Sequence, residues 1–281
     1  MTIDDAVSGL VYLVAVFSLF VIGKAVFDKL NSRYVLREQL LERDNLAVAL
    51  SIIGYYFGLT FAVGGIFLGP ELPWVTELID IYVYGLLSIA LLNLSAIIND
   101  KIILRKFDNV KEIIEDQNPG TGIVECSNYI AVGLIINGAM SGEGGGIVTA
   151  LAFWILGQGV LIIASFVYDF ITPFDVHAEI EKDNVAVGVA FAGMTVAIGN
   201  IIRIGISGDF LTWQLNLGQF AGFVVFGLIL LPVLRLFTDK LLLPGESLTK
   251  ELVQQEKPNV GAGAIEAFSY IAASFLLGWV V

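Results

Sequence analysis

The amino-acid sequence predicts an all-α integral membrane protein with eight transmembrane helices, built as two tandem four-helix repeats in parallel orientation. Three observations lead to this prediction: the apolar content, the length of the apolar runs, and a stretch of sequence that returns. Of 281 residues, 57% are hydrophobic and only 15% are charged, a composition outside the range of soluble domains. The mean hydropathy of +0.83 agrees.

Eight apolar runs are each long enough to cross a hydrocarbon layer of about 30 Å as a helix, which takes about 20 residues. Helix is the expected state because unpaired backbone groups are costly in lipid, and none of the runs alternates in polarity as a barrel strand would. The predicted spans are 7–27, 46–68, 78–98, 120–140, 147–167, 185–206, 214–236 and 260–281.

The chain repeats itself at a fixed offset. Residues 44–49 (DNLAVA) return 139 positions later as 183–188 (DNVAVG), and 99–104 (NDKIIL) return at the same offset as 238–243 (TDKLLL). Self-similarity at one period sets the unit of the fold. The sequence therefore predicts two equivalent units.

A third repeated block completes each unit and carries an acidic residue. Residues 120–131 (GTGIVECSNYIA) return as 261–272 (GAGAIEAFSYIA). We expect a first membrane repeat over 1–142 and a second over 143–281. Each holds an even number of helices, so both copies point the same way, and we expect a pseudo-twofold axis along the membrane normal.

Lysine and arginine predict the topology. Fourteen of the fifteen lie in, or at the edge of, the first, third, fifth and seventh loops. By the positive-inside rule these loops face the cytoplasm, which places both termini outside, on the periplasmic side of a bacterial inner membrane. The four tryptophans all fall in the outer part of this topology, as an interfacial belt would: Trp74, Trp154, Trp213 and Trp279.

Glu125 and Glu266 are the leading candidate site residues. Each lies about five residues past a predicted helix start, roughly 8 Å into the span at 1.5 Å per residue. Charges at that depth usually face a bundle interior or a wet cavity. Tyr129 and Tyr270 follow at i+4, on the same helical face and within hydrogen-bonding reach of the carboxylate.

These two Glu–Tyr pairs have a functional and a structural interpretation. In the first they form a cation or proton site entered from the cytoplasm, with both pairs facing one axis or with two separate pockets. In the second the carboxylates are stabilised by the helix dipole and extend to the membrane surface.

Asn200 and Arg203 share one face of the sixth span, where repeat one has an aromatic residue and a glycine. This asymmetry is typical of a duplicated protein in which one half has specialised. Arg203 either attracts an anionic headgroup or substrate, gates a path, or extends outward to Asp209 or Glu71.

Several classes of function are excluded. A single histidine and a single cysteine argue against a His-built metal site and an internal disulfide, and a formal charge of −12 argues against nucleic-acid binding. No nucleophile stands with a base in a recognisable set. We therefore expect no cofactor, no metal and no enzymatic activity.

The pattern Asp-Asn-x-Ala-x-Ala/Gly at 44–49 and 183–188, with the closing block LIINGAM at 134–140, resembles the YjfL-like bacterial inner-membrane family over nearly the whole chain. That resemblance implies single or tandem copies of a four-helix unit of unknown function, in an envelope-stress context. It supplies no catalytic residues, and some members lack the glutamate found at 125 and 266.

The leading functional hypothesis is a small transporter or channel-like protein that handles a cation, proton or small amine through polar groups between the repeats. The alternative is a non-transporting scaffold that organises lipid or recruits a cytoplasmic protein partner through its charged inner loops. A duplicated unit often replaces a homodimer of the single unit, so both a monomer and a homo-oligomer stay open.

Overall fold

The computed structural model describes residues 3–69, 72–104, 108–243 and 245–281, and every regular secondary-structure element in these ranges is a helix. Eight helices are long and apolar enough to cross a membrane, as the sequence predicts. They are α1 (Ile3–Leu30), α3 (Leu46–Ile66), α4 (Trp74–Ile98), α6 (Pro119–Met140), α7 (Ile147–Ile171), α9 (Val185–Ile206), α10 (Trp213–Phe237) and α12 (Val260–Val280).

Each repeat also contains shorter elements at equivalent places. Helices α4 and α10 both continue into a wider π-helical turn, η1 (Asn99–Ile103) and η2 (Thr238–Leu242). Short helices connect the spans at one end of the molecule: α2 (Leu36–Leu41), α5 (Asn109–Ile114), α8 (Val176–Glu181) and α11 (Leu248–Val253).

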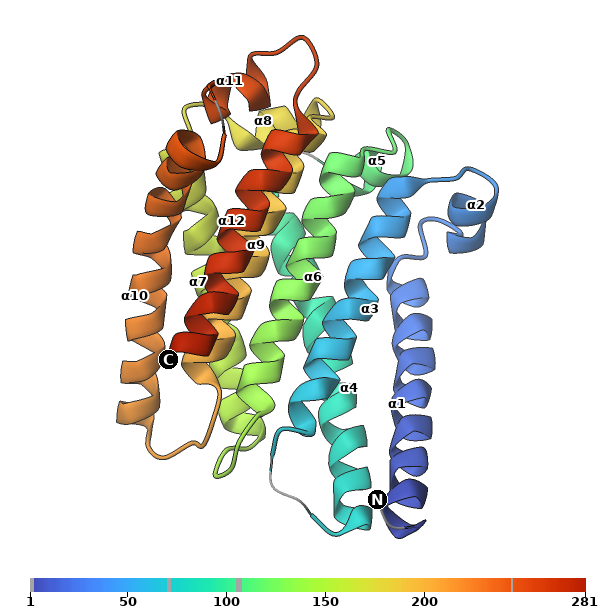
Figure 1. Cartoon of the computed structure of the whole chain (residues 1–281). Helices are drawn as coiled ribbons and strands as arrows, with labels where there is room; N and C mark the ends of the chain where they lie inside the picture. The colour runs from blue at the N-terminus through green and yellow to red at the C-terminus, as the bar shows by residue number, and fades with distance from the viewer. Residues whose placement is uncertain (1–2, 70–71, 105–107, 244) are drawn as a thin grey trace.

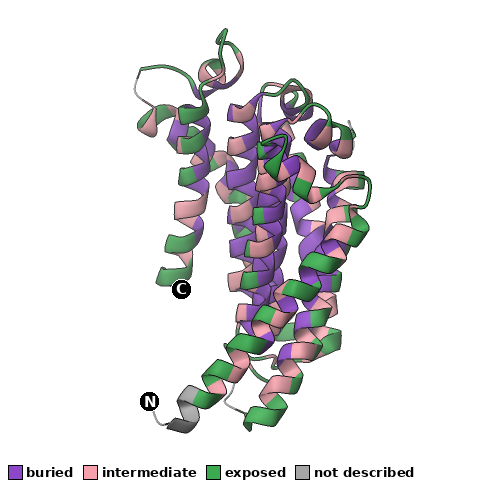
Figure 2. Cartoon of the chain, turned by 90° about the vertical axis from the view of Figure 1, so that its right-hand side faces the viewer, coloured by how far each residue is buried: buried purple, intermediate pink, exposed green. Residues whose placement is uncertain are grey.

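The long helices form two rows (Figure 1). Helices α3, α6, α9 and α12 stand side by side in chain order, and α1, α4, α7 and α10 form a second row against them. The middle of the first row is the core: 83% of the most apolar 18-residue stretch of α9 is buried, against 22% of that of α1. The same contrast is visible in Figure 2, where the buried residues concentrate in the central helices.

The two repeats are parallel, as expected, but a twofold axis does not relate them. The seam between them is α6 of repeat one against α9 of repeat two. A twofold axis would bring α12 against α3 in the same way, yet these helices lie at opposite ends of the row (Figure 1). The repeats are instead displaced along the row, which is a head-to-tail relation.

Glycines allow the first row to pack closely. A Cβ at Gly54 or Gly58 of α3 would collide with the backbone of Cys126 or Tyr129 on α6. Gly54 and Gly58 therefore form a small-residue packing face. Gly218 and Gly222 of α10 have the same spacing, but no described atom outside the helix lies within 4 Å of a Cβ placed there.

An asparagine caps the start of every helix in the first row. Each side-chain Oδ1 accepts the backbone N–H three residues on, as expected for an N-cap. Three of the four side chains also donate Nδ2 to a carbonyl of the short helix that follows along the row: Asn45 to Ile113, Asn118 to Ile180 and Asn184 to Leu252, at 2.8, 2.7 and 2.9 Å. These bonds tie neighbouring helix pairs together.

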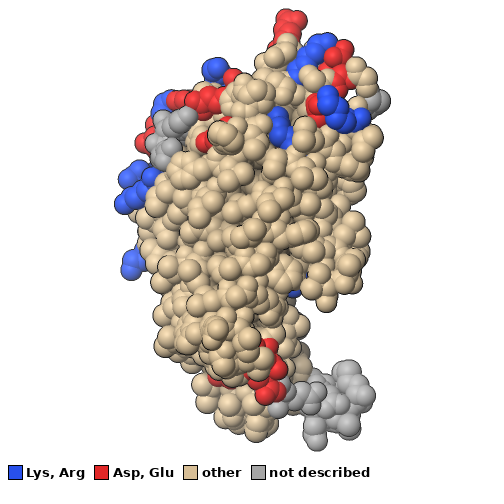
Figure 3. Space-filling model, turned by 90° about the vertical axis from the view of Figure 1, so that its left-hand side faces the viewer, with Lys and Arg blue, Asp and Glu red and all other residues tan. Residues whose placement is uncertain are grey.

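The two ends of the bundle differ in charge. The chain termini lie opposite the short helices (Figure 1), and on the face drawn in Figure 3 most lysines and arginines gather at the short-helix end. The tryptophan belt is only partly present. Trp74, Trp213 and Trp279 are exposed, but Trp154 is 5% exposed and donates its indole N–H to Ser95 Oγ at 2.9 Å.

Candidate functional site

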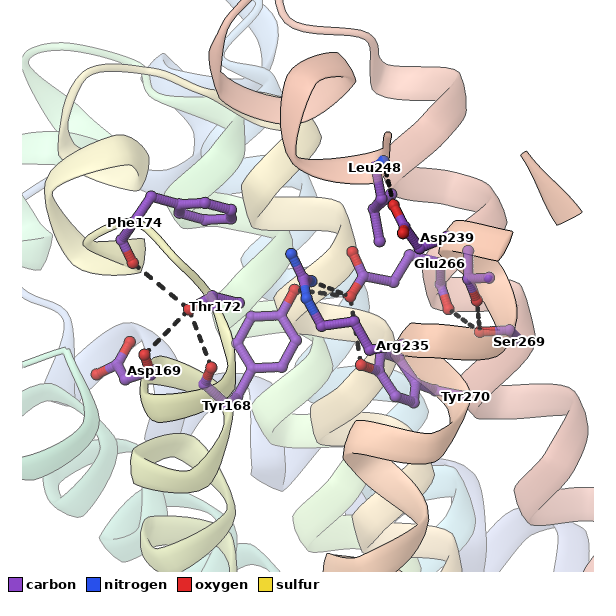
Figure 4. A network of polar contacts seen from close by, with 11 residues as sticks. Tyr168, Asp169, Thr172, Phe174, Arg235, Asp239, Leu248, Glu266, Ser269 and Tyr270 are labelled. Atoms are coloured by element: carbon purple, nitrogen blue, oxygen red, sulfur yellow. Dashed lines mark hydrogen bonds and ion pairs between the residues drawn. The ribbon is translucent and has the colours of Figure 1, made fainter. Parts of the chain in front are cut away.

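Repeat two holds a buried ion pair near the short-helix end (Figure 4). Glu266 on α12 is fully buried and its Oε1 lies 2.5 Å from Nη1 of Arg235, on the last turn of α10. Tyr168 of α7 and Tyr270 of α12 donate their hydroxyls to the same oxygen at 3.2 and 3.3 Å. The predicted i+4 contact between Glu266 and Tyr270 is therefore present.

The surroundings of Arg235 explain how a charge is accommodated at this depth. Its guanidinium lies 5.8 Å from the ring centroids of both Tyr168 and Phe174, a favourable position for a cation. A buried carboxylate without a partner would carry a desolvation cost of several kcal/mol, which the guanidinium and two phenols offset. Repeat two thus supplies its own cation to Glu266.

Repeat one arranges the equivalent carboxylate differently. Glu125 on α6 is half-buried and accepts a hydrogen bond from Ser51 Oγ of α3 at 2.6 Å. Within the described ranges no lysine or arginine forms an ion pair with it. At the offset of 139, Ala96 stands where repeat two has Arg235. Tyr129 is buried and, unlike Tyr270 in repeat two, makes no hydrogen bond to the glutamate among the described residues.

A cavity of about 370 Å³ lies beside Glu125. It is bounded by α4, η1, α6 and the segment after α1, and exposed Arg33 and Lys101 also line it, at the short-helix end. Its polar lining includes Tyr34, Asn93, Asn99, Asp100, Glu125, Asn128 and Tyr129. Burial raises the pKa of Tyr34, and the charge of Glu125 raises it further, so this phenol stays protonated.

The two glutamates therefore occupy separate pockets, one in each repeat, and do not face a shared axis. In the described part of the chain, the seam between the repeats is closely packed at two places where a path was expected. Along that seam, a Cβ at Gly188 would lie 2.8 Å from the carbonyl of Gly120, and one at Gly199 would lie 2.6 Å from Cα of Ala131. Backbone contact fills the seam, and the cavity lies inside repeat one.

Asn200 and Arg203 form a separate cluster, at the opposite end of the bundle from both glutamates. Arg203 Nε donates to Asn200 Oδ1 at 2.8 Å, and Asn200 Nδ2 donates to Ser274 Oγ at 3.1 Å. Arg203 makes no described ion pair with Asp209, whose Oδ1 instead accepts a backbone N–H at 2.8 Å. Glu71, the other expected partner, lies outside the described residues.

Sequence reasoning missed Arg235, which it counts only as one of the basic residues that mark the seventh loop. The fixed offset of 139 contains the missing signal, because it pairs a buried arginine with Ala96. In the described part of the chain, no group of three His, Cys, Asp or Glu side chains is placed to hold a metal ion.

Eight apolar helices in two parallel units, each with a glutamate at the equivalent position of its last long helix, define a polytopic membrane protein made by duplication. The family model described as Domain of Unknown Function (DUF350) matches residues 1–140 and again residues 144–281, so the chain belongs to this family. This match supports a membrane family of unknown function, but it does not support the more specific YjfL-like name.

Two relatives show the duplicated and the single form. The chain is 25% identical to a UPF0719 transmembrane protein of Aquifex aeolicus (strain VF5) over 270 residues, which is 94% of this chain and 97% of the relative. It is 25% identical to the UPF0719 transmembrane protein YshE of Bacillus subtilis (strain 168) over 134 residues, which is 47% of this chain and 97% of YshE. No solved structure matches the chain.

Proposed function

We propose that the protein moves a small cation, a proton or a small amine across the bacterial inner membrane, through the interior of repeat one. The observation that carries this proposal is Glu125, an intramembrane carboxylate that lines a cavity and has no basic partner in the described ranges. Ionisable groups at such depth are costly, and those of transporters mark ion and substrate paths.

Polar groups along α4 support a path from this cavity to the other end of the bundle. Asn93 donates to Tyr55 at 3.3 Å. Ser88 lies five residues closer to the outer end, where its hydroxyl lies 3.6 Å from Met140 Sδ. Beyond them a second cavity of about 330 Å³ is lined by Glu77, Asp80 and Tyr84 among others. Two acid-lined cavities thus lie at opposite ends of one helix.

Flux through reconstituted protein tests the proposal. Proteoliposomes are loaded to report the movement of H⁺, Na⁺, K⁺ and methylammonium, with empty liposomes as the baseline. We expect Glu125→Gln to reduce flux by roughly tenfold or more, since it removes the charge that attracts the cation. The matched control is Glu115→Gln, which removes an exposed carboxylate at the same end. Flux no greater than in empty liposomes for every solute would reject the proposal.

The scaffold alternative has weaker support. A partner would dock on the charged short helices, but many of their charges already pair with one another, as in Arg43–Glu38, Lys111–Asp116, Lys182–Glu179 and Lys250–Glu246. Replacing residues 36–41 and 109–114 by neutral linkers and comparing co-purified proteins tests this alternative. Unchanged recovery of partners would count against it.

A further inference from the structure

In repeat two, an arginine side chain occupies the space that is equivalent to the repeat-one cavity. The guanidinium of Arg235 reaches from α10 to Glu266 on α12 and is buried with it. In repeat one the corresponding helices are α4 and α6, and Ala96 offers only a methyl group. Ala96 and Glu125 both line the cavity. The space that a tethered cation occupies in one repeat is therefore open in the other.

A second difference between the repeats leaves hydrogen-bond acceptors unused. In repeat two, the Thr238 hydroxyl donates to Ser269 Oγ at 2.7 Å, and the Ser269 hydroxyl donates to the Glu266 carbonyl at 2.8 Å, so both hydroxyls are hydrogen-bonded. The equivalent residues of repeat one are Asn99 and Asn128, which are 2% and 3% exposed and line the cavity. The buried side-chain oxygen of each has no hydrogen-bond partner among the residues that the structure describes. Unsatisfied buried acceptors are costly, and a ligand with several N–H groups would satisfy them.

We propose that the repeat-one cavity binds an organic monocation with several N–H donors, a guanidinium or a primary ammonium, with Glu125 as its counter-ion. This assignment rests on the cavity being the site of the proposed function and names the chemical class of its substrate. The donors would reach the oxygens of Asn99 and Asn128, as the guanidinium of Arg235 reaches Glu266. The phenol rings of Tyr34 and Tyr129 also line the space, and aromatic rings favour organic cations.

The other charged groups around the cavity are compatible with this ligand. Asp100 adds a second carboxylate, already bonded by Asn109 Nδ2 at 2.6 Å. Arg33 and Lys101 are exposed and sit at the short-helix end, where water screens them. The amides and phenols of the lining, together with the Glu125 carboxylate, can form hydrogen bonds to an organic cation.

Binding to purified protein in detergent tests the ligand class without requiring transport. The probes are methylguanidinium and methylammonium at millimolar concentration, with tetramethylammonium, which has no N–H group, at equal ionic strength. We expect the first two to raise the melting temperature and tetramethylammonium to leave it unchanged. Glu125→Gln should weaken the response roughly tenfold or more. An equal response to tetramethylammonium, or an undiminished response in Glu125→Gln, would overturn the proposal.

Two exchanges between the repeats sharpen the test. Ala96→Arg gives repeat one its own tethered cation, so the variant should melt higher and lose the response to methylguanidinium. Arg235→Ala opens the second pocket, so methylguanidinium should stabilise this variant more than the natural protein. Full retention of the response in Ala96→Arg, or no added response in Arg235→Ala, would contradict the assignment.

The outcomes separate this proposal from the proposed function. Binding of methylguanidinium without any flux would reject transport and leave the ligand class intact. Flux that depends on Glu125, together with no binding of methylguanidinium or methylammonium, would support transport and reject the ligand class.

Discussion

Arg235 Nη1 lies 2.5 Å from Glu266 Oε1, and the two side chains, 9% and 0% exposed, join α10 to α12 inside the second repeat. The first repeat keeps the carboxylate as Glu125 and replaces the arginine with Ala96. Both repeats have thus kept the glutamate, but the residue opposite it differs between them. In repeat two the carboxylate faces an arginine of the same repeat, and in repeat one it lines a cavity.

Removing Arg235 should strongly destabilise the protein. Arg235→Ala leaves the buried Glu266 carboxylate without its cation, with only the hydroxyls of Tyr168 and Tyr270 as partners. Breaking a buried pair in this way costs about 3–5 kcal/mol. Replacing both members with apolar residues, as in Arg235→Met with Glu266→Leu, should recover most of the loss because no buried charge remains. Denaturant unfolding in detergent measures both. If Arg235→Ala alone lowers the free energy of unfolding by less than about 1 kcal/mol, the result would contradict the burial of this pair.

The asparagine that joins the two repeats should contribute more to stability than its counterpart at the end of the row. Asn118 is 1% exposed, caps α6 and bonds to Ile180 O and Glu112 Oε2. Asn259 caps α12 but is exposed and has no described carbonyl partner on a following short helix. We expect Asn118→Ala to cost about 2–3 kcal/mol and Asn259→Ala about 1 kcal/mol. Equal losses of unfolding free energy in the two variants would show that the hydrogen bond between the repeats adds no stability.

Much of the fold follows from local sequence. The eight spans can be read because a membrane imposes a minimum apolar length. The chain termini and the basic loops lie at opposite ends of the bundle, as the placement of lysine and arginine predicts. The caps at Asn45 and Asn184 could be predicted because an asparagine immediately before an apolar run satisfies the free N–H groups of a helix start.

The site was less accessible to sequence reasoning because it depends on which face each helix turns inward. Arg235 lies near a basic loop, and its position alone does not separate a surface cation from a buried partner. Trp154 fits an interfacial belt by depth, but it faces Ser95 inside the bundle. Parallel repeats are compatible with both a twofold axis and a displacement, and only packing of α6 on α9 decides between them.

Glycines with the same spacing should differ sharply in their tolerance of a side chain. Gly54→Val would force α3 away from the backbone of Cys126, and overpacking of this kind typically costs about 1–3 kcal/mol. Gly218→Val is the matched control, since no described atom crowds that position. Thermal melting in detergent compares the two. A Gly218→Val variant that loses as much as Gly54→Val would place α10 in a contact that this structure lacks.

The positive-inside bias predicts which end of the bundle faces the cytoplasm. In a Cys126→Ser background, Glu115→Cys places a thiol at the short-helix end and Glu143→Cys places one at the opposite end. We expect an impermeant maleimide to label the second in intact cells and the first only after the membrane is opened. Labelling in the reverse order would invert the topology and move the Glu125 cavity to the outer face.

Glu112 should make the stability of the protein depend on pH. This side chain is 4% exposed, and burial raises the pKa of its carboxyl group above the ordinary value, although a hydrogen bond from Asn118 opposes the shift. A carboxyl group with a raised pKa in the folded state favours folding while it is protonated. Its contribution to stability therefore falls as the pH rises above its pKa in the unfolded chain.

Glu112→Gln removes this penalty and retains an acceptor for Asn118. The first helix pair already has Gln39 at the equivalent place, where its Oε1 accepts from Asn45 at 3.0 Å. We expect the variant to melt higher than the natural protein at pH 7 and the two to converge below about pH 4, where the glutamate is protonated in both states. Glu115→Gln, at an exposed position, is the control, and its melting temperature should not differ from that of the natural protein in this pH-dependent way. A variant that melts lower at pH 7 would mean that the charged form of Glu112 is the one the fold prefers.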